Sequence, residues 1–450
     1  MIKNKKIFLF ILLFVFLCSN IYPLDLSDIF DRYKTPLLEV SFLNGGLCSI
    51  NKYVGNREWA NIGTATIKNN IQSGFTWDND GFPCNMIDHP YHGVQYYTIA
   101  RSSGLNYLDS FILTTFGSLQ WEYIMETNQP SLNDFMITTG GGAVMGEYFY
   151  RFSKYLMNRG DRGLKKYAYN ILSFTVSPFT FLNEKLFIKK DYKETSISKS
   201  DNWEFSFDIG WSMLKNTQNN VSDLLNISFN SEYKNRDSSN FSAFDVMEFK
   251  FSLFKAEDKL HKRIILNSKL VDKEIDRFGS FGLWTSYKYN EVIENYRYSG
   301  IGIGPGFNYN SNFFNFNSKL FFIIGAATAR HALIYGDEFY EEKGETYQFG
   351  TEIIDGAYYI GKGLMSEHNL GINLYNFKLN FGVKQFWINS FHATDANEHR
   401  LLYPISLTYS KNNYFLKIQK QYAANISFYD DYIPINDKID SVSVIMGYGI

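Results

Sequence analysis

The chain has 450 residues, with 44 Lys and Arg against 46 Asp and Glu and a net charge of −2. The sequence has no basic block or arginine-rich stripe, so nothing in it predicts binding to nucleic acid. Aromatic residues make up 18% of the chain, although hydrophobic residues reach only 45%. Many rings in a moderately apolar chain are typical of membrane β-barrels, and AT-rich codon usage produces the same bias.

Residues 1–20 predict a signal peptide, and therefore export. Lysines at the start precede an apolar run over residues 7–17, which is too short for a bilayer span of about 20 residues. Further along, no stretch of sequence resembles a membrane helix, so the exported chain is either soluble or a β-barrel. The mature part keeps Cys48 and Cys84, and their spacing leaves open whether they form a disulfide or stay free thiols.

Residues 21–76 are predicted to form an N-terminal segment with one or two strands, the clearest over residues 59–77. Residues 77–190 predict a helical insert, because apolar residues over 90–157 are spaced by three and four. A first helix contains Arg101, and a second covers about 105–127. Residues 163–188 resemble a further helix followed by a loop.

The polar residues of the insert are ordered in a way that an ordinary helix does not require. The run from Asp88 to Gly93, with His89 and His92, opens the insert. In the second helix, Glu122 and Glu126 share one face with Thr115 and Ser118. Two carboxylates one turn apart repel each other, so we expect another group to offset them.

The third helix has its own signals. Ser131 is the expected N-cap, and Asp134 at the third helical position makes a capping-box variant. Asn133, Glu147 and Arg151 align on one face, with the last two an i,i+4 ion pair. Four glycines between residues 140 and 146 each cost roughly 1 kcal/mol in a helix, which predicts the close approach of another helix.

Taken together, these motifs resemble an uncharacterised bacterial domain family found in exported proteins with barrel-like C-terminal halves. The resemblance covers roughly residues 75–155 and implies no established activity. Its motifs are Trp77-x-x-Asp80-x-Phe82, His89-Pro-Tyr-His92-Gly93, Ala100-Arg101-x-x-Gly104, Ser118-x-x-Trp121-Glu122-x-x-x-Glu126, Pro130-Ser131-x-Asn133-Asp134 and Gly142-x-x-x-Gly146-Glu147. The order of residue types is also similar to that of the VanZ-like membrane families.

Residues 191–450 predict a β-barrel. From about residue 203, apolar and polar residues alternate in successive segments, as in Trp203–Trp211, Leu225–Tyr233, Met247–Leu253, Phe377–Val383 and Ile405–Tyr409. Such strands suit a sandwich or a barrel, but their lengths approach the 9–11 residues of a membrane-spanning strand, and they recur about twelve times. The predicted fold is mainly β, a transmembrane antiparallel barrel of about 12–14 strands with an α-helical insert in the N-terminal half.

The C-terminus supports the barrel. Every second residue is apolar and lies on one face: Val442, Val444, Met446, Tyr448 and Ile450. Outer-membrane barrels typically end on such a strand with a final aromatic residue. Here the final residue is Ile450 and the nearest ring belongs to Tyr448, so the pattern is kept without its terminal aromatic.

Two interpretations of the insert stay open. In the first, it is a catalytic or metal site. The candidate ligands of a divalent ion are Asp88, His89, His92, Glu122 and Glu126, with Asp134 as a further oxygen donor. The candidate acid–base groups acting on a lipid or glycan ester are His89, His92, Glu122 and Glu126. The spacing matches no zinc-protease motif, and the sequence has no Gly-x-Ser-x-Gly element.

In the second interpretation the polar residues form a structural network that requires no cofactor. Glu122 and Glu126 then accept hydrogen bonds from Arg101, His92 and the amides at the start of the third helix. The network residues are Arg101, Ser118, Ser131, Asn133, Asp134, Glu147 and Arg151.

The function predicted first is an outer-membrane barrel with a helical plug or cap and a structural or transport role in the envelope. Its expected partners are outer-membrane lipids and the barrel-assembly machinery. The alternative is an enzyme that modifies envelope lipid or glycan. A third reading is a secreted, soluble β-sandwich, such as a glycan-binding module.

Overall fold

The computed structural model describes residues 26–77, 80–160, 162–187, 202–217, 221–235, 241–256, 259–291, 297–328, 358–391, 397–428 and 434–450. The predicted signal peptide at residues 1–20 lies outside the described residues. The chain divides into two compact units. The helical unit comprises Met1–Asp78 and Tyr91–Thr195, and the barrel unit comprises Asn79–Pro90 and Ser196–Ile450.

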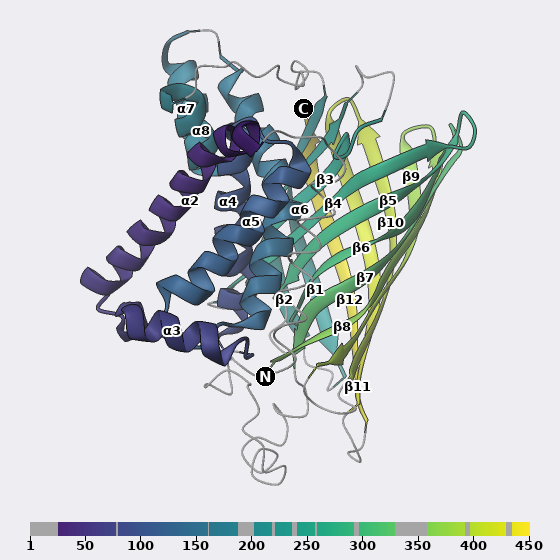
Figure 1. Ribbon diagram of the computed structural model, residues 1–450. Coiled ribbons are helices and arrows are strands. Elements are labelled where there is room, and N and C mark those ends of the chain that lie inside the picture. Colours follow the sequence, from purple (N-terminus) through teal and green to yellow (C-terminus); the bar gives the residue numbers. More distant parts are fainter. Residues whose placement is uncertain are drawn as a thin grey trace. The chain divides into compact units, whose positions relative to one another are not determined.

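Twelve strands of the described chain form a closed antiparallel barrel (Figure 1). The strands are β1 (Trp203–Asn216), β2 (Val221–Lys234), β3 (Val246–Ala256), β4 (Lys259–Glu274), β5 (Gly279–Asn290), β6 (Tyr298–Asn310), β7 (Phe314–Thr328), β8 (Tyr358–Leu374), β9 (Phe377–Ser390), β10 (Asn397–Lys411), β11 (Tyr414–Phe428) and β12 (Ile435–Gly449). Each strand pairs with its neighbours in sequence, and β12 pairs with β1 to close the barrel. The predicted barrel is therefore confirmed, at the lower end of the expected strand number.

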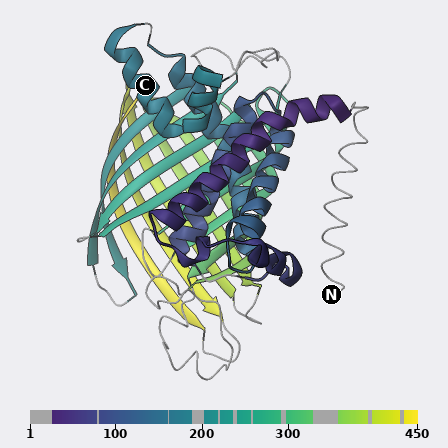
Figure 2. The ribbon, with the colours of Figure 1, turned by 60° about the vertical axis from the view of Figure 1, so that its left-hand side comes forward.

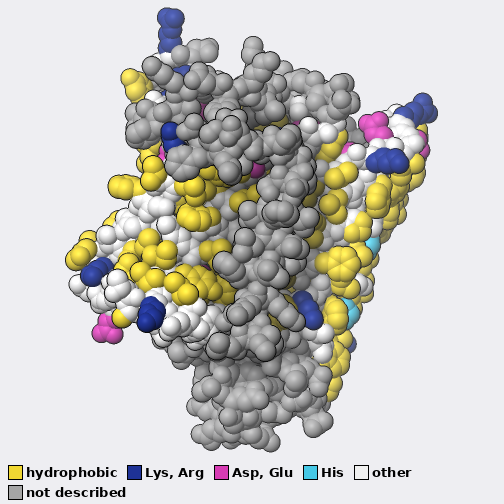
Figure 3. Space-filling model, in the orientation of Figure 1, with side chains coloured by type: hydrophobic (Ala, Val, Ile, Leu, Met, Phe, Trp, Pro, Cys, Tyr) yellow, Lys and Arg dark blue, Asp and Glu magenta, His cyan; other side chains and the backbone are white. Residues whose placement is uncertain are grey.

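The two faces of the wall differ as the alternation predicts. On the outer face, Phe207 is 51% exposed and Ile227 is 55% exposed, whereas their inward neighbours Asp208 and Ser228 are buried. Figure 3 shows apolar side chains along the barrel wall on the right-hand side. Half-exposed aliphatic and aromatic side chains on the outside of a closed barrel are typical of a surface that contacts the hydrocarbon core of a bilayer. The strands, of 11 to 17 residues, are long enough to cross that core. The barrel is of the transmembrane type.

The helical unit contains the remaining helices of the described chain. They are α2 (Leu26–Tyr53), η1 (Glu58–Ala60), α3 (Thr64–Ser73), α5 (Tyr107–Gln120), the π-helical turn η3 (Trp121–Met125), α6 (Leu132–Met157), α7 (Gly163–Val176), α8 (Pro178–Leu182) and η4 (Asn183–Phe187). Helix α4 (His89–Ser102) begins in the barrel unit, directly after the π-helical turn η2 (Cys84–Asp88), and continues in the helical unit. Among the described residues, no helix has the length and apolar character needed to cross a bilayer.

The strand predicted over residues 59–77 is wrong. Helix α3 occupies the middle of this range, and only Thr76 makes a β-bridge, to Ser131. Ile67 and Ile71 lie four residues apart, which places them one helical turn apart, so the spacing fits a helix better than a strand. The loop expected within residues 163–188, which carries Pro178 and Asn183, is instead the short helix α8 followed by η4. Pro178 occupies the first turn of α8, where proline is tolerated.

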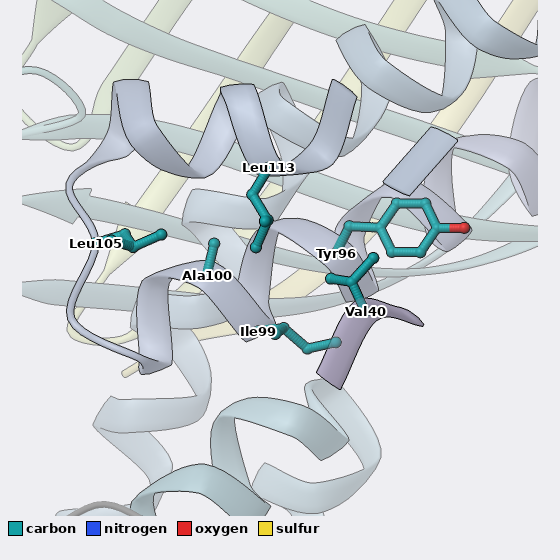
Figure 4. Close-up of a cluster of buried hydrophobic side chains, with 6 residues drawn as sticks. All are labelled: Val40, Tyr96, Ile99, Ala100, Leu105 and Leu113. Carbon is teal, nitrogen blue, oxygen red and sulfur yellow. The ribbon is translucent and has the colours of Figure 1, made fainter. Parts of the chain in front are cut away.

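A small apolar core holds α2, α4 and α5 together (Figure 4). Its buried members are Val40, Tyr96, Ile99, Ala100, Leu105 and Leu113. Figure 2 shows the long helix α2 running diagonally across the shorter helices of this unit. The predicted close helix approach is confirmed at Gly93 and Gly142, since a Cβ added to Gly142 would lie 2.5 Å from the carbonyl carbon of Gly93. Helices α4 and α6 therefore meet backbone to backbone.

Candidate functional site

The centre of the helical unit is a buried charge cluster around Glu147 of α6. Arg101 of α4 grips the carboxylate with two hydrogen bonds, Nε to Oε2 at 2.7 Å and Nη2 to Oε1 at 3.1 Å. Arg151 donates from Nε to Oε1 at 2.7 Å, which confirms the predicted i,i+4 pair. The Tyr97 hydroxyl donates to Oε2 at 3.0 Å. Burial alone would raise the pKa of Glu147, but the two guanidinium groups outweigh it and lower the pKa to about 2.

This cluster is charged but not reactive at neutral pH. A carboxyl group with so low a pKa holds no proton to donate, and its lone pairs already accept three donor residues. Burial raises the pKa of Tyr97, and the adjacent carboxylate of Glu147 adds to the rise, so the hydroxyl stays neutral. The sequence indicates Glu147, Arg101 and Arg151, but Tyr97 is missed. Its position four residues before Arg101 places both on one face of α4 and is the available signal.

Glu122, in the π-helical turn η3, caps the start of α6. Its side chain is buried, and Oε2 accepts the backbone N–H of Ser131 at 2.8 Å. Ser131 is the N-cap, as predicted, because its hydroxyl oxygen accepts the backbone N–H of Asp134 at 3.2 Å. In a capping box the third helical residue takes the N-cap amide, and here Glu122 from the preceding segment does so instead. The positive end of the α6 dipole also favours this carboxylate.

The hydrogen bonds of Glu126 to Trp121 and Asn70 differ from those predicted. Its Oε1 accepts the indole N–H of Trp121 at 2.5 Å, and its backbone carbonyl accepts the side-chain amide of Asn70 at 2.9 Å. The expected hydrogen bonds from Arg101 to Glu122 and Glu126 are wrong, since Arg101 is taken up by Glu147 and by the carbonyl of Leu105.

His92 is part of a chain of polar groups between α4 and α2. The Tyr96 hydroxyl donates to Asn44 Oδ1 at 2.5 Å and lies 2.9 Å from His92 Nε2. Because the hydroxyl proton is used on Asn44, we assign the proton of His92 to Nε2, which then donates to Tyr96. The His92 ring also packs edge-on against Trp121, with centroids 4.8 Å apart. The sequence gives no sign of Asn44, which lies 48 positions away from His92.

A second group of polar side chains lies in the barrel unit. Asp80, Cys84 and His89 bring a carboxylate oxygen, a sulfur and a ring nitrogen within 4.8 Å of one another. The Cys84 thiol donates to Asp80 Oδ2 at 3.4 Å. Of these residues, only His89 is among the metal ligands predicted from sequence. Cys84 and Cys48 are both free thiols.

Tyrosines of the barrel wall hold the backbone of this segment. Tyr287 of β5 donates to the carbonyl of Met86, and Tyr358 of β8 donates to the carbonyl of Asp80 at 2.5 Å. The Asn85 amide donates to the Tyr358 hydroxyl at 2.6 Å. Tyr287 shares its face of the sheet with the exposed Ile303, so the segment covers the outer face of the wall. This part of the wall faces the chain's own segment instead of lipid.

The structure thus divides the predicted site residues between the two units. Asp88 and His89 belong to the barrel unit, where Asp88 is exposed. The remaining predicted residues lie in the helical unit: His92, Arg101, Ser118, Glu122, Glu126, Ser131, Asn133, Asp134, Glu147 and Arg151. Within that unit, Asn133 donates to Asp134 and accepts the Ser131 hydroxyl, and Ser118 is buried in α5.

Comparison with known proteins identifies part of the chain. Residues 74–179 match the model of a domain of unknown function (DUF3943). The stretch that resembles an uncharacterised family therefore does match one, over less than half of the chain. None of the curated proteins matches.

Several solved barrels are similar to the chain. The KdgM porin is 8% identical with a TM-score of 0.27, and the match covers 54% of this chain and 98% of the porin. The NanC porin is 8% identical with a TM-score of 0.30, covering 52% and 98%. The toluene transporter TodX of P. putida is 9% identical with a TM-score of 0.23, covering 56% and 90%. The barrel is established by its own strand pairing, and no function is inferred from these similarities.

Proposed function

We propose that this chain is exported and folds into the outer membrane, where the barrel passes small hydrophilic solutes. One observation carries the proposal: the wall is apolar on its outer face and hydrophilic on its inner face. Phe207, Ile227 and Ile418 point outward and are about half exposed, whereas the inward side carries Asp208, Lys250 and many Ser and Asn residues. A polar interior of this kind forms the water-filled channel of porins.

The placement of the barrel in a membrane is tested with two lysine substitutions, one on the outer face of the wall and one on its inner face. Ile227→Lys puts a charge on the lipid face near the middle of β2, which costs roughly 2–4 kcal/mol at the bilayer midplane. Asn230→Lys is the matched control, because Asn230 faces inward and donates to Asp208 Oδ2 at 2.9 Å. We expect wild type and Asn230→Lys in outer-membrane fractions with heat-modifiable migration on gels, and Ile227→Lys depleted. Full solubility of the wild type without detergent would overturn the proposal.

We propose that the helical unit acts as the plug or cap of this barrel, with domains at residues 21–76, 77–190 and 191–450. In this proposal the signal peptide at residues 1–20 directs export, and the barrel-assembly machinery recognises β12. The similarity to the VanZ-like families consists only of the order of residue types along the chain. Single-channel recordings test the cap: a deletion of residues 91–176 is expected to raise the open probability, and unchanged gating would contradict it.

A second candidate function is metal binding, which could serve a metal-dependent enzyme that modifies envelope lipid or glycan. The observation in its favour is the convergence of Asp80, Cys84 and His89. Cysteine, histidine and carboxylate are ligands of zinc, and three protein ligands with an open fourth position are typical of catalytic zinc. Zinc bonds of roughly 2.0–2.3 Å would draw the three atoms closer together than they are now.

Elemental analysis of the purified protein tests this second function. We expect about one zinc per chain in the wild type, and its loss in Cys84→Ser and His89→Ala. Asp88→Asn is the control, because Asp88 is the exposed neighbour of His89 and is not part of the group. Zinc-free wild type after growth in zinc would eliminate this candidate. His92→Ala and Glu122→Gln test the acid–base pair separately, through the composition of the envelope lipids.

A further inference from the structure

The lumen of the barrel is divided into a dry side and a wet side. Contacts between strands that are not neighbours cross the concave face: Lys319 of β7 lies 2.7 Å from Glu248 of β3, and Tyr298 of β6 packs on Phe386 of β9. The side chain of Lys319 is only 3% exposed and that of its partner Glu248 is 37% exposed, and Lys319 Nζ lies 3.8 Å from the ring centroid of Trp284. One side of the lumen is therefore filled by rings and paired charges.

The other side carries accessible lysines. The side chain of Lys250 on β3 is 38% exposed and that of Lys384 on β9 is 44% exposed, whereas Lys288 on the dry side is 5% exposed. Lys417 of β11 also faces inward, because its neighbour Ile418 faces outward and is half exposed. These side chains reach water inside the barrel, where a dissolved ion can meet them.

Four of the inward cations lie close enough to act together. Lys417 lies within electrostatic range of Lys250 and Lys384, and Lys250 and Lys384 each lie within range of Arg263. We name Lys250, Arg263, Lys384 and Lys417 the lumen cation cluster. Lys378 adds a further positive charge beside Lys417 and also faces Glu232.

The carboxylates nearby do not balance the cluster. Asp208 lies 4.0 Å from Lys250, and Glu367 lies 3.3 Å from Lys384 but also contacts Lys288. Lys417 and Arg263 make no ion pair among the described residues. Arg263 instead donates to Asn290 Oδ1 at 2.7 Å and stacks over Phe254. Among the residues that the structure describes, two carboxylates thus face four cluster cations and Lys288, which leaves an excess of positive charge in this part of the wall.

We propose that the lumen cation cluster makes the barrel selective for small organic anions, such as solutes that carry a carboxylate or a phosphate. Rings of Lys and Arg are the usual means by which pores favour anions, since each cation offsets the cost of desolvating the solute. Lysine offers a rotatable point charge that releases its ligand readily, which suits passage better than tight binding. This inference rests on the proposed passage function and adds its charge preference.

The test uses the full-length protein in planar lipid bilayers under a tenfold gradient of KCl, with the reversal potential as readout. Wild type is expected to prefer chloride over potassium several-fold. Lys250→Gln, Lys384→Gln and Lys417→Gln together are expected to bring the permeability ratio close to one, and Lys417→Glu alone to shift it toward potassium. Millimolar citrate or glucose phosphate is expected to reduce chloride current in wild type and less in the triple variant.

Lys420→Gln is the matched control, because Lys420 lies on the same strand but faces outward, paired with Val442. Lys417→Gln alone serves if the triple variant does not fold, since Lys417 makes no ion pair among the described residues. Absence of any conductance both in the full-length protein and in the variant that lacks residues 91–176 would refute the proposed passage and this inference together. A conducting barrel that prefers potassium, or whose ratio is the same in Lys417→Gln and wild type, would refute the anion preference alone.

Discussion

In the helical unit, the buried carboxylate of Glu147 is met by Arg101, Arg151 and Tyr97. In the barrel unit, Lys417 faces a wet lumen and makes no ion pair among the described residues. A buried charge must be paired, because the desolvation of an unpaired one costs several kcal/mol, approximately. A charge in a water-filled lumen stays hydrated, so it needs no partner from the protein and remains accessible to a solute. The comparison indicates that the buried charges around Glu147 are satisfied within the fold, whereas some lumen charges of the barrel, such as that of Lys417, have no ion-pair partner among the described residues.

The largest expected loss of stability comes from removing the buried carboxylate of Glu147. Glu147→Gln leaves two guanidinium groups facing a neutral amide in a dry site, which is expected to cost about 3–5 kcal/mol. The loss is measured as a shift in the urea midpoint of the helical circular-dichroism signal in the detergent-solubilised, full-length protein. Glu58→Gln is the control, because Glu58 is exposed, and a change within about 0.5 kcal/mol is expected there. Equal midpoints for the two variants would show that the cluster does not hold the fold.

Acid should weaken the helical unit through the same carboxylate. The folded pKa of Glu147 is about 2, below the ordinary value of about 4.3 for an unfolded chain. Its contribution is therefore complete above about pH 4.3 and is lost as the pH falls toward 2, by roughly 3 kcal/mol in all. Midpoints measured between pH 6 and pH 2.5 should fall in the wild type and fall less in Glu147→Gln. Parallel curves for the two proteins would contradict this assignment.

A substitution at the close contact between α4 and α6 is expected to lower the stability of the helical unit by a smaller amount. In Gly142→Ala the new methyl group would press on the backbone of Gly93, and overpacking of this kind costs about 1–3 kcal/mol. Gly45→Ala on α2 is the matched control, because no atom lies within 4 Å of its added Cβ. There the helix propensity of alanine should add up to about 1 kcal/mol. Changes of the same sign in both variants would show that the α4–α6 contact is not tight.

The barrel could be predicted because each strand carries its own signal. Alternation in a segment such as Phe207–Trp211 assigns both faces without knowledge of any partner. The partners in the helical unit are set by tertiary packing instead. From the sequence, Arg101 is expected beside Glu122 and Glu126, whereas the contact of Gly93 with Gly142 brings it to Glu147. Asn44 is missed for the same reason, since α2 lies far away in sequence from Tyr96, its hydrogen-bond partner on α4.

The smallest expected losses of stability come from the two groups that cap the start of α6, the Ser131 hydroxyl and the Glu122 carboxylate. Ser131→Ala removes the hydroxyl that accepts the Asp134 amide, and the loss of such a cap costs about 1 kcal/mol. The backbone N–H of Ser131 still reaches Glu122 in this variant, so Glu122→Gln probes the other half of the cap. Because an amide oxygen can still accept that N–H, Glu122→Gln should lose only the charge interaction with the helix dipole, about 0.3–1 kcal/mol. If Glu122→Gln instead altered the envelope lipids at unchanged helical stability, Glu122 would be a reactive group and not a cap.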